Sequence, residues 1–318
     1  MKSLYRVYRP KTFNEVIGQD HIIKTLQNQI KNNKVAHAYL FCGNRGTGKT
    51  SIAKIFAREL NKEVKNGELD IFEIDAASNN SVQDIREIIE KVKYLPVAGK
   101  NKIYIIDEVH MFSSSAFNAF LKTLEEPPSH AIFILCTTEP HKLLPTIQSR
   151  CLRFDFRAVS TKDIEILLTK ILKKENIIVS AEAVKMLSEA GCGSVRDALS
   201  FTETVISYCG EKQITEADVI AVLGTVSSET LKMLLDSIIK CDTKKIIQTC
   251  ADIFAKGINA GMLIKNFLNI IKIEFIKNPA LYSNVFKLFS ELEITIKTST
   301  DVFWQFENTC LLACIKQV

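Results

Sequence analysis

The strongest constraint on this chain is the stretch at residues 43–50, GNRGTGKT, which fits the pattern G-x-x-x-x-G-K-[ST]. An apolar run at residues 38–42 precedes it, and residues 51–60 carry apolar side chains at helical spacing. Glycines let backbone N–H groups approach phosphate oxygens, and the start of a helix adds partial positive charge. Strand, glycine-rich turn and helix in this order predict a phosphate-binding loop rather than a chance surface turn.

The residues of this loop have individual expected roles. Lys49 should reach the β- and γ-phosphates of a nucleotide, and the Thr50 hydroxyl should ligate Mg²⁺. The sequence therefore predicts a protein that binds ATP together with Mg²⁺. The loop residues that we expect to bind ATP are Gly43, Gly46, Gly48, Lys49, Thr50 and Ser51.

A second motif lies at the end of the strand-like run 102–108, where Asp107 and Glu108 follow the apolar residues 103–106. A run that is apolar on both faces suits a central strand of a covered parallel sheet. Asp107 can hold the Mg²⁺ shared with Thr50, and Glu108 is placed to polarise a water for attack on the γ-phosphate. His110, beside them, is either a structural or a relay residue.

The first 157 residues alternate strand-like and helical patterns. This alternation predicts a doubly wound α/β domain with a parallel sheet, followed by helices only. We expect a small helical module at residues 158–224 and a second helical part at residues 225–318. The expected strands are 38–42, 70–75, 102–108, 131–135 and 152–156, and the helices among them are 21–30, 51–60, 82–94, 113–126 and a short one from 144.

Further candidates lie outside the two motifs. A hydroxyl at the end of the fourth strand would lie next to the γ-phosphate, and Thr138 has that position. Arg196 lies in the first turn of an expected helix, where a cation is unfavourable unless it serves a ligand such as a phosphate. Tyr5, Tyr8 and Ile17 could contact an adenine ring, or their segment could be an arm packed on the core.

Small polar residues crowd the start of the helix expected at residues 82–94. Capping explains one of them, but several together also offer hydroxyl, amide and N–H groups to an outside anion such as a DNA phosphate. Lys122 is either merely solvated or links its helix to bound DNA. The candidates for DNA contact are Ser78, Asn79, Asn80, Ser81 and Lys122.

Composition narrows the class of protein. The net charge of +5 permits a nucleic-acid partner without arguing for one. No apolar run approaches the ~20 residues of a membrane span, and no signal peptide is recognisable. The nine cysteines contain no C-x-x-C pair, which indicates free thiols in a reducing cytosol. We therefore expect a cytoplasmic protein with no membrane partner.

The motifs YRPKTFNEVIGQ, GNRGTGKTS, IYIIDEVHMFS, AFNAFLKTLEEPP, CTTEPHKLLPTIQSRC and GSVRDALS occur in that order. Together they resemble the AAA+ ATPase subunits of the bacterial replicative clamp loader, the gamma/tau family of DNA polymerase III. The resemblance covers essentially all of residues 1–224 and matches the remainder only in helical character and length. It implies an AAA+ nucleotide-binding domain at 1–157, a helical lid at 158–224 and an oligomerising collar at 225–318.

The resemblance also implies roles for single residues. Arg196 resembles the sensor arginine of the lid, and Thr138 resembles the sensor on the strand. Arg150 resembles an arginine finger, which acts on the ATP of the neighbouring subunit. The positions that match the family's nucleotide pocket are Tyr5, Arg9 and Ile17.

The partners implied are the delta and delta-prime subunits, further gamma/tau copies, the sliding clamp and primed-template DNA. The chain departs from the family in one respect, because no cysteine lies between Cys42 and Cys136. The usual four-cysteine zinc module is therefore missing, and no zinc is expected. Without a long basic tail, the sequence resembles the short, gamma-like form. Alternatives are a non-hydrolysing stator of the delta-prime type and a replication factor C small subunit.

Overall fold

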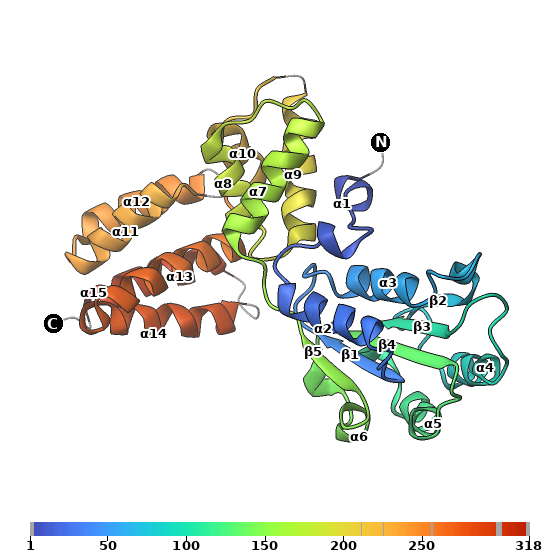
Figure 1. Cartoon of the computed structure of the whole chain (residues 1–318). Coiled ribbons are helices and arrows are strands. Elements are labelled where there is room, and N and C mark those ends of the chain that lie inside the picture. The colour runs from blue at the N-terminus through green and yellow to red at the C-terminus, as the bar shows by residue number, and fades with distance from the viewer. Residues whose placement is uncertain (1–2, 211, 225, 256, 297–300, 316–318) are drawn as a thin grey trace. The chain divides into compact units, whose positions relative to one another are not determined.

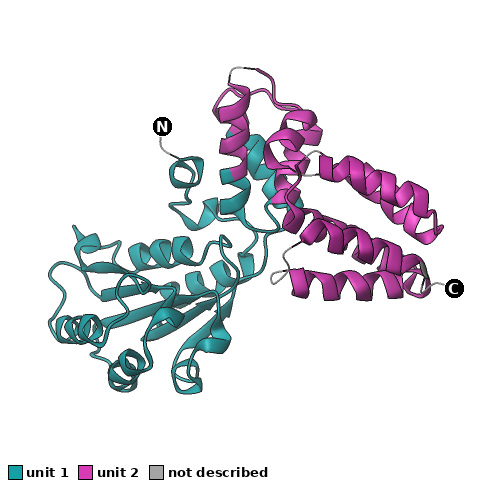
Figure 2. Cartoon of the chain, turned by 180° about the vertical axis from the view of Figure 1, so that it is seen from behind, with its two compact units in different colours: residues 1–171, 191–200 teal, residues 172–190, 201–318 magenta. Residues whose placement is uncertain are grey.

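A computed structural model of the chain describes residues 3–210, 212–224, 226–255, 257–296 and 301–315. These residues form two compact units (Figures 1 and 2). The first unit holds residues 1–171 and 191–200, and the second holds 172–190 and 201–318. The division into three domains that the sequence indicates stays a prediction.

The first unit is built on a parallel sheet of five strands in the order β2-β3-β4-β1-β5. The register sets Cys42 beside Thr137 and Asp75 beside Asp107, so the carboxyl ends of neighbouring strands lie at one edge. All five predicted strands are confirmed, with ends that differ by at most two residues. Their bounds are β1 Ala38–Cys42, β2 Ile71–Asp75, β3 Lys102–Asp107, β4 Ala131–Thr137 and β5 Leu152–Asp155.

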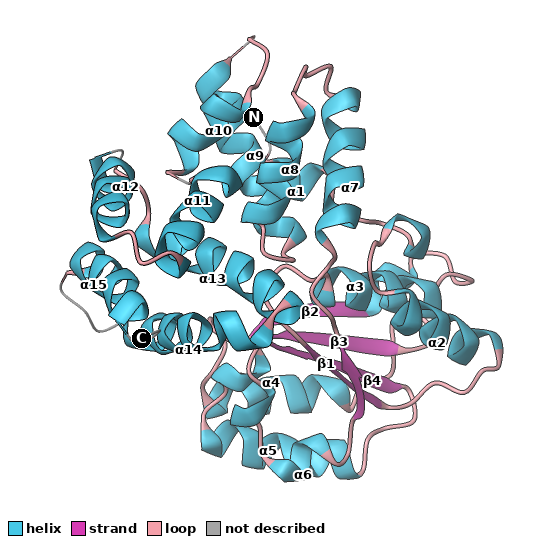
Figure 3. Ribbon diagram, turned by 90° about the vertical axis from the view of Figure 1, so that its left-hand side faces the viewer, coloured by secondary structure: helices cyan, strands magenta, loops and turns pink. Residues whose placement is uncertain are grey.

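Helices cover both faces of this sheet, as the doubly wound fold predicts (Figure 3). Side chains alternate along β1, so Tyr39 and Phe41 face one layer and Leu40 faces the other. The first layer contains α2 (Asp20–Lys31) and α3 (Lys49–Leu60), and the second contains α4 (Val82–Val92), α5 (Ser114–Glu125) and α6 (Pro145–Gln148).

Short elements complete the first unit. The α-helix α1 (Leu4–Val7) precedes the sheet and has no predicted counterpart. The 3-10 helices are η1 (Phe13–Glu15), η2 (Gly67–Asp70), η3 (Val109–Met111) and η4 (Pro140–Lys142). Asp70, which was expected to begin a strand, ends η2 instead.

The connection between α3 and β2 is tied to the loop that follows α4. Asn61 donates to the carbonyl oxygens of Gly67 (3.0 Å) and Asn101 (2.8 Å), and accepts from the Asn101 N–H (3.0 Å). The Asp70 carboxylate accepts hydrogen bonds from the N–H groups of residues 97–99. Both ends of the connection are thereby fixed to the same loop.

The second unit is helical, as the sequence predicts. Two helices, α7 (Thr161–Lys174) and α9 (Val195–Cys209), begin in the first unit and end in the second. Phe267, Phe289 and Phe306 are fully buried in the second unit and contact one another. No helix among the described residues is long and apolar enough to cross a bilayer. The other helices are α8 Ala181–Ala190, α10 Glu216–Leu223, α11 Ser228–Ile239, α12 Thr243–Ala255, α13 Ala260–Lys277, α14 Pro279–Thr295 and α15 Val302–Ile315.

Candidate functional site

The glycine-rich loop joins the end of β1 to the start of α3. Gly48 is the N-cap of α3 with a φ of 100°, and Gly46 has a φ of 76°. Both angles lie in the left-handed region, which glycine enters without the steric cost of a Cβ. The loop therefore delivers the first N–H groups of α3 to a position where they and the helix dipole favour an anion.

Lys49 is buried at the start of α3. Its Nζ donates hydrogen bonds to the carbonyl oxygens of Gly43 (2.8 Å) and Asn44 (2.9 Å). Burial lowers the pKa of the Lys49 ammonium, and the nearby Glu108 carboxylate acts in the opposite direction. The ammonium is thus held by its own loop, at the point where phosphate oxygens could replace the two carbonyl groups.

Thr50 and Asp107 connect α3 to the end of β3. The Thr50 Oγ1 donates to Oδ2 of Asp107 over 2.8 Å. Burial raises the pKa of the Asp107 carboxyl, while the hydrogen bond from Thr50 acts to lower it. A hydroxyl and a carboxylate oxygen are the hard ligands that Mg²⁺ prefers. This pair of donors fits a Mg²⁺ ion.

Glu108 has a left-handed backbone, with φ 49° and ψ 44°. Such angles are uncommon for a residue other than glycine and cluster at functional sites. Its Oε2 accepts hydrogen bonds from the Thr138 hydroxyl (3.0 Å) and the Thr138 N–H (3.3 Å). The hydroxyl that the sequence assigns to phosphate sensing therefore binds Glu108 in this structure.

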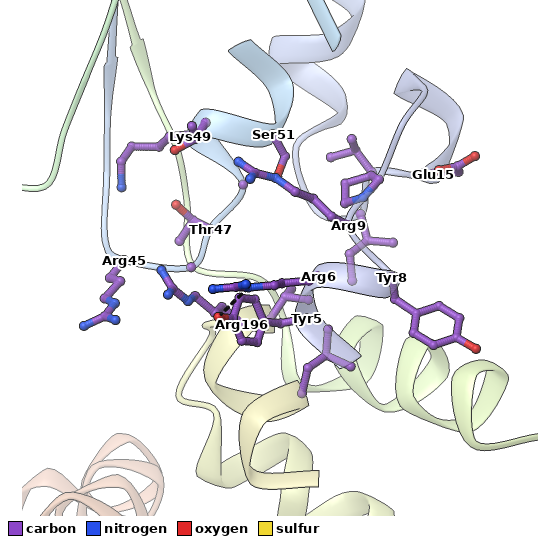
Figure 4. A pocket seen from close by; sticks show the side chains of 18 of the residues that line it. Tyr5, Arg6, Tyr8, Arg9, Glu15, Arg45, Thr47, Lys49, Ser51 and Arg196 are labelled. Atoms are coloured by element: carbon purple, nitrogen blue, oxygen red, sulfur yellow. Dashed lines mark hydrogen bonds between the residues drawn. The ribbon is translucent and has the colours of Figure 1, made fainter. Parts of the chain in front are cut away.

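A pocket of about 590 Å³ lies beside these residues, entirely within the first unit (Figure 4). It brings together most of the residues that the sequence analysis selects for ATP. The lining residues among them are Tyr5, Arg9, Ile17, Gly46, Gly48, Lys49, Thr50, Ser51, Asp107, Glu108 and Arg196.

The N-terminal segment and the first turn of α9 form the opposite wall of this pocket. The Arg196 guanidinium lies 4.9 Å from the centre of the Tyr5 ring, and Figure 4 shows the two side by side. Arg6 Nε donates to the Tyr5 hydroxyl over 3.1 Å, and Arg9 Nε donates to Ser51 Oγ over 3.1 Å. The segment of residues 4–20 thus contributes side chains to the pocket.

Two predicted ATP-site residues and the proposed finger are not among the lining residues. Gly43 contributes its carbonyl to Lys49, and Thr138 binds Glu108. Arg150 donates to the Thr146 carbonyl oxygen and to Glu125 Oε1, both over 2.7 Å. Its role in this or a neighbouring site stays a prediction.

Three of the candidates for DNA contact form hydrogen bonds within the turn in which they lie. Ser81 caps α4 in a reciprocal capping box with Asp84. Ser78 Oγ donates to Oδ2 of Asp75 over 3.1 Å, and Asn79 Nδ2 donates to the Asp75 carbonyl oxygen over 3.0 Å. A DNA contact by these residues stays a prediction. The remaining candidates, both exposed, are Asn80 and Lys122.

The sequence analysis did not select some of the residues that line the pocket, and it left two roles open for His110. Leu167 and Leu199 line the pocket, although in the sequence they resemble any apolar residue of a helix core. Glu73 lines it from β2, and a single carboxylate in a strand carries no recognisable signal. Nδ1 of His110 lies 3.5 Å from Oε2 of Glu108.

Three family models match consecutive parts of the chain. A model described as "DNA polymerase III, delta subunit" matches residues 18–160. One described as "DNA polymerase III clamp loader subunit, ATPase lid domain" matches residues 163–211. A third, "DNA polymerase III subunits gamma and tau domain III", matches residues 214–280.

Curated relatives are similar over most of the chain. The DNA polymerase III subunit tau of Bacillus subtilis is 44% identical over 284 residues, which are 84% of this chain and 50% of that protein. The tau subunit of Escherichia coli K12 is 39% identical over 285 residues, 84% of this chain and 44% of that protein. The gamma subunit of Buchnera aphidicola subsp. Baizongia pistaciae is 38% identical, covering 84% of this chain and 77% of that protein. The chain thus spans about half the length of the tau subunits it matches.

Solved structures share the fold. The RuvB Holliday junction branch migration motor of Thermotoga maritima superposes with a TM-score of 0.56 at 20% identity. The superposition covers 73% of this chain and 79% of that one. The predicted AAA+ architecture, a parallel-sheet domain followed by helical domains, is confirmed.

Proposed function

This chain belongs to the family of DNA polymerase III gamma and tau subunits, and on that basis we propose that it is the ATP-hydrolysing motor of a bacterial replicative clamp loader. The observation that carries the proposal is that Lys49, Thr50, Asp107 and Glu108 line one pocket. A non-hydrolysing stator has no need for this complete set of side chains.

Each side chain has a defined task in hydrolysis. Lys49 exchanges the carbonyl oxygens of its own loop for the β- and γ-phosphate oxygens. Thr50 and Asp107 would hold Mg²⁺, which would neutralise negative charge on the phosphates. Glu108 accepts a proton from the water that attacks the γ-phosphate.

The wall formed by the N-terminal segment and α9 receives the rest of the nucleotide. Tyr5, Arg9 and Ile17 line the pocket and surround the adenine. Arg196 supplies positive charge to the phosphates from the first turn of α9. Thr138 senses the γ-phosphate through its hydroxyl group.

The remaining roles belong to an assembly. Arg150 acts as a finger on the ATP of a neighbouring subunit, and the polar turn at residues 78–81 together with Lys122 contacts DNA phosphates. The partners are delta and delta-prime subunits, further copies of this chain, the sliding clamp and primed-template DNA. ATP binding prepares clamp and DNA for loading, and hydrolysis releases both.

The test is the rate of ATP hydrolysis by the chain mixed with delta and delta-prime subunits, with and without clamp and primed DNA. We expect strong stimulation only when all components are present. A rate that does not change when clamp and DNA are added would indicate an ATPase with another substrate.

Two variants define the site in the same assay. Lys49→Ala should abolish nucleotide binding, and Glu108→Gln should retain binding but lose hydrolysis, because it removes only the base. If both variants hydrolysed ATP like the unaltered chain, the proposed motor function would be wrong.

A further inference from the structure

The Glu108 carboxylate is held by one of its two oxygens. Oε2 receives both hydrogen bonds from Thr138 and lies 3.5 Å from Nδ1 of His110. Oε1 has no hydrogen-bond partner among the described residues of the chain. The side chain is thus anchored at Oε2 and leaves Oε1 to receive a proton.

His110 fills the space between Glu108 and the end of β4. Its side chain is only 7% exposed. Nδ1 lies 2.9 Å from the Thr137 hydroxyl, and Nε2 lies 3.8 Å from Oε1 of Glu139. A proton on Nδ1 would bind Thr137 and attract Glu108, whereas a lone pair there would face a carboxylate oxygen.

The Thr137 hydroxyl is itself fixed by the backbone. It accepts a hydrogen bond from the N–H of Glu139 over 3.0 Å, and Thr137 is fully buried at the end of β4. The imidazole therefore rests on a rigid strand end rather than on a mobile surface group. The ring position is set by the end of β4 and by η3, which carries His110.

The Thr138 hydroxyl cannot donate to Glu108 and to a γ-phosphate at the same time. A hydroxyl donates a single hydrogen bond, and that of Thr138 is given to Glu108 in this structure. When the same hydroxyl turns to a γ-phosphate, Oε2 keeps the 3.3 Å bond from the Thr138 N–H and the attraction of His110. The ring and the Thr138 N–H then together form the part of the anchor that does not depend on the nucleotide.

We propose that His110 is a positioning residue for hydrolysis, which holds Oε2 of Glu108 at the end of β4 while Oε1 faces the attacking water. The inference rests on the proposed function, because it assigns the group that orients its general base. His110 itself does not touch the nucleotide and transfers no proton to it.

The test compares two amides at position 110. Asn reproduces a polar atom near the place of Nδ1, and Gln reproduces one near Nε2. His110→Asn should retain most of the kcat for ATP in the complete assembly with clamp and primed DNA. His110→Gln should lose about 10- to 100-fold in kcat, the scale expected when a reacting group is misplaced. Neither should alter the affinity for ATP.

A matched control is His141→Asn. His141 also faces Glu139, at 3.6 Å, but its side chain is 74% exposed and lies away from Glu108 in η4. We expect its kcat to equal that of the unaltered chain. If His110→Gln does not fold, as judged by its melting temperature, Thr137→Val replaces it, since loss of that hydroxyl frees the imidazole and should lower kcat in the same way.

Equal kcat values for the Asn, Gln and unaltered chains would overturn the role of His110. Equal losses in the Asn and Gln variants, accompanied by equally lowered melting temperatures, would assign the ring a purely structural role. The proposed function fails separately, when Glu108→Gln has no effect on hydrolysis.

Discussion

Single residues hold together parts of this chain that lie far apart in the sequence, and Asp70 is the clearest case. Its buried carboxylate accepts hydrogen bonds from the N–H groups of Val97 (2.8 Å), Ala98 (2.7 Å) and Gly99 (2.6 Å). Burial acts to raise the pKa of this carboxyl, but the three N–H groups outweigh it and hold the pKa below its usual value. The ionised form therefore stabilises the fold.

Asp70→Asn should lower the free energy of unfolding by about 2–3 kcal/mol at neutral pH, since the amide NH₂ cannot accept from these N–H groups. The pKa is depressed by folding, so this stabilisation is fully present above the unfolded pKa of about 4 and is lost as pH falls through the folded value. Urea unfolding at neutral and acidic pH measures the difference.

The control for this change is Glu68→Gln in the same 3-10 helix. Glu68 pairs with Arg58 at 3.1 Å, but its side chain is 74% exposed, so little stability depends on it. A loss at Asp70 no larger than that at Glu68, or one that persists unchanged in acid, would contradict the assigned role.

The candidate residues that the sequence could predict are those whose neighbours in the chain are also their neighbours in space. Lys49 and Thr50 lie in one contiguous motif, and Asp107 follows an unmistakable buried strand. His110 is different, because its contacts with Thr137 and Glu139 depend on the register between β3 and β4. The anchoring of Asp70 to residues 97–99 is likewise invisible without the folded loop.

At the scale of elements, the start of α9 is docked on the glycine-rich loop. The Val195 N–H donates to the Gly46 carbonyl oxygen over 3.2 Å, and Ser194 is buried against Gly46. A Cβ added to Gly46 would collide with Oγ of Ser194. The close approach of the two elements therefore requires glycine at this position.

Gly46→Ala should weaken ATP binding and lower stability, because it combines a φ of 76° with this collision. Gly210→Ala is the matched control, since Gly210 also has a positive φ of 62° but no atom within 4 Å of the added Cβ. Strain alone should cost the control about 1–2 kcal/mol. Calorimetric titration with ATP and thermal melting separate the two effects. Identical melting shifts and unimpaired ATP binding in the Gly46 variant would show that the docked arrangement is not required.

The elements themselves were predictable where the pattern is long. The strands β1, β3 and β4 have apolar interiors, and the helices of the first unit carry clear apolar stripes. The four-residue helix α1 was missed because its length allows no periodicity to be read, whereas the equally short α6 is marked by Pro145 at its start. The order of the strands was not predicted, since crossover connections leave several orders open.

At the scale of the whole molecule, the finger role that we propose for Arg150 requires several copies of the chain to assemble. It lies outside the pocket of its own chain and is held by Glu125 at the surface. Arg150→Ala should retain ATP binding in the isolated chain, but slow hydrolysis in the complete assembly by about 10³-fold or more, as loss of an arginine finger does. Nucleotide binding and steady-state hydrolysis, each measured for the isolated chain and for the complete assembly, test this prediction.

Arg153→Ala is the control for the finger. Arg153 follows Arg150 in the chain, lies in β5 and pairs with Asp155 at 2.8 Å, with a side chain that is 44% exposed. We expect unchanged hydrolysis for this variant. Loss of ATP binding by the isolated Arg150 variant would mean that the arginine serves its own site and not that of a neighbour.

The connection between α3 and β2 has a practical consequence for labelling this protein. Asn61 and Asp70 fix the two ends of this connection to one loop. The segment 62–66 therefore begins and ends at fixed positions, even if residues are inserted into it. The entropy of closing a loop grows only slowly with its length. A fluorescent reporter domain spliced into this connection would therefore leave the sheet undisturbed, and it would report where the chain is in any complex that it joins.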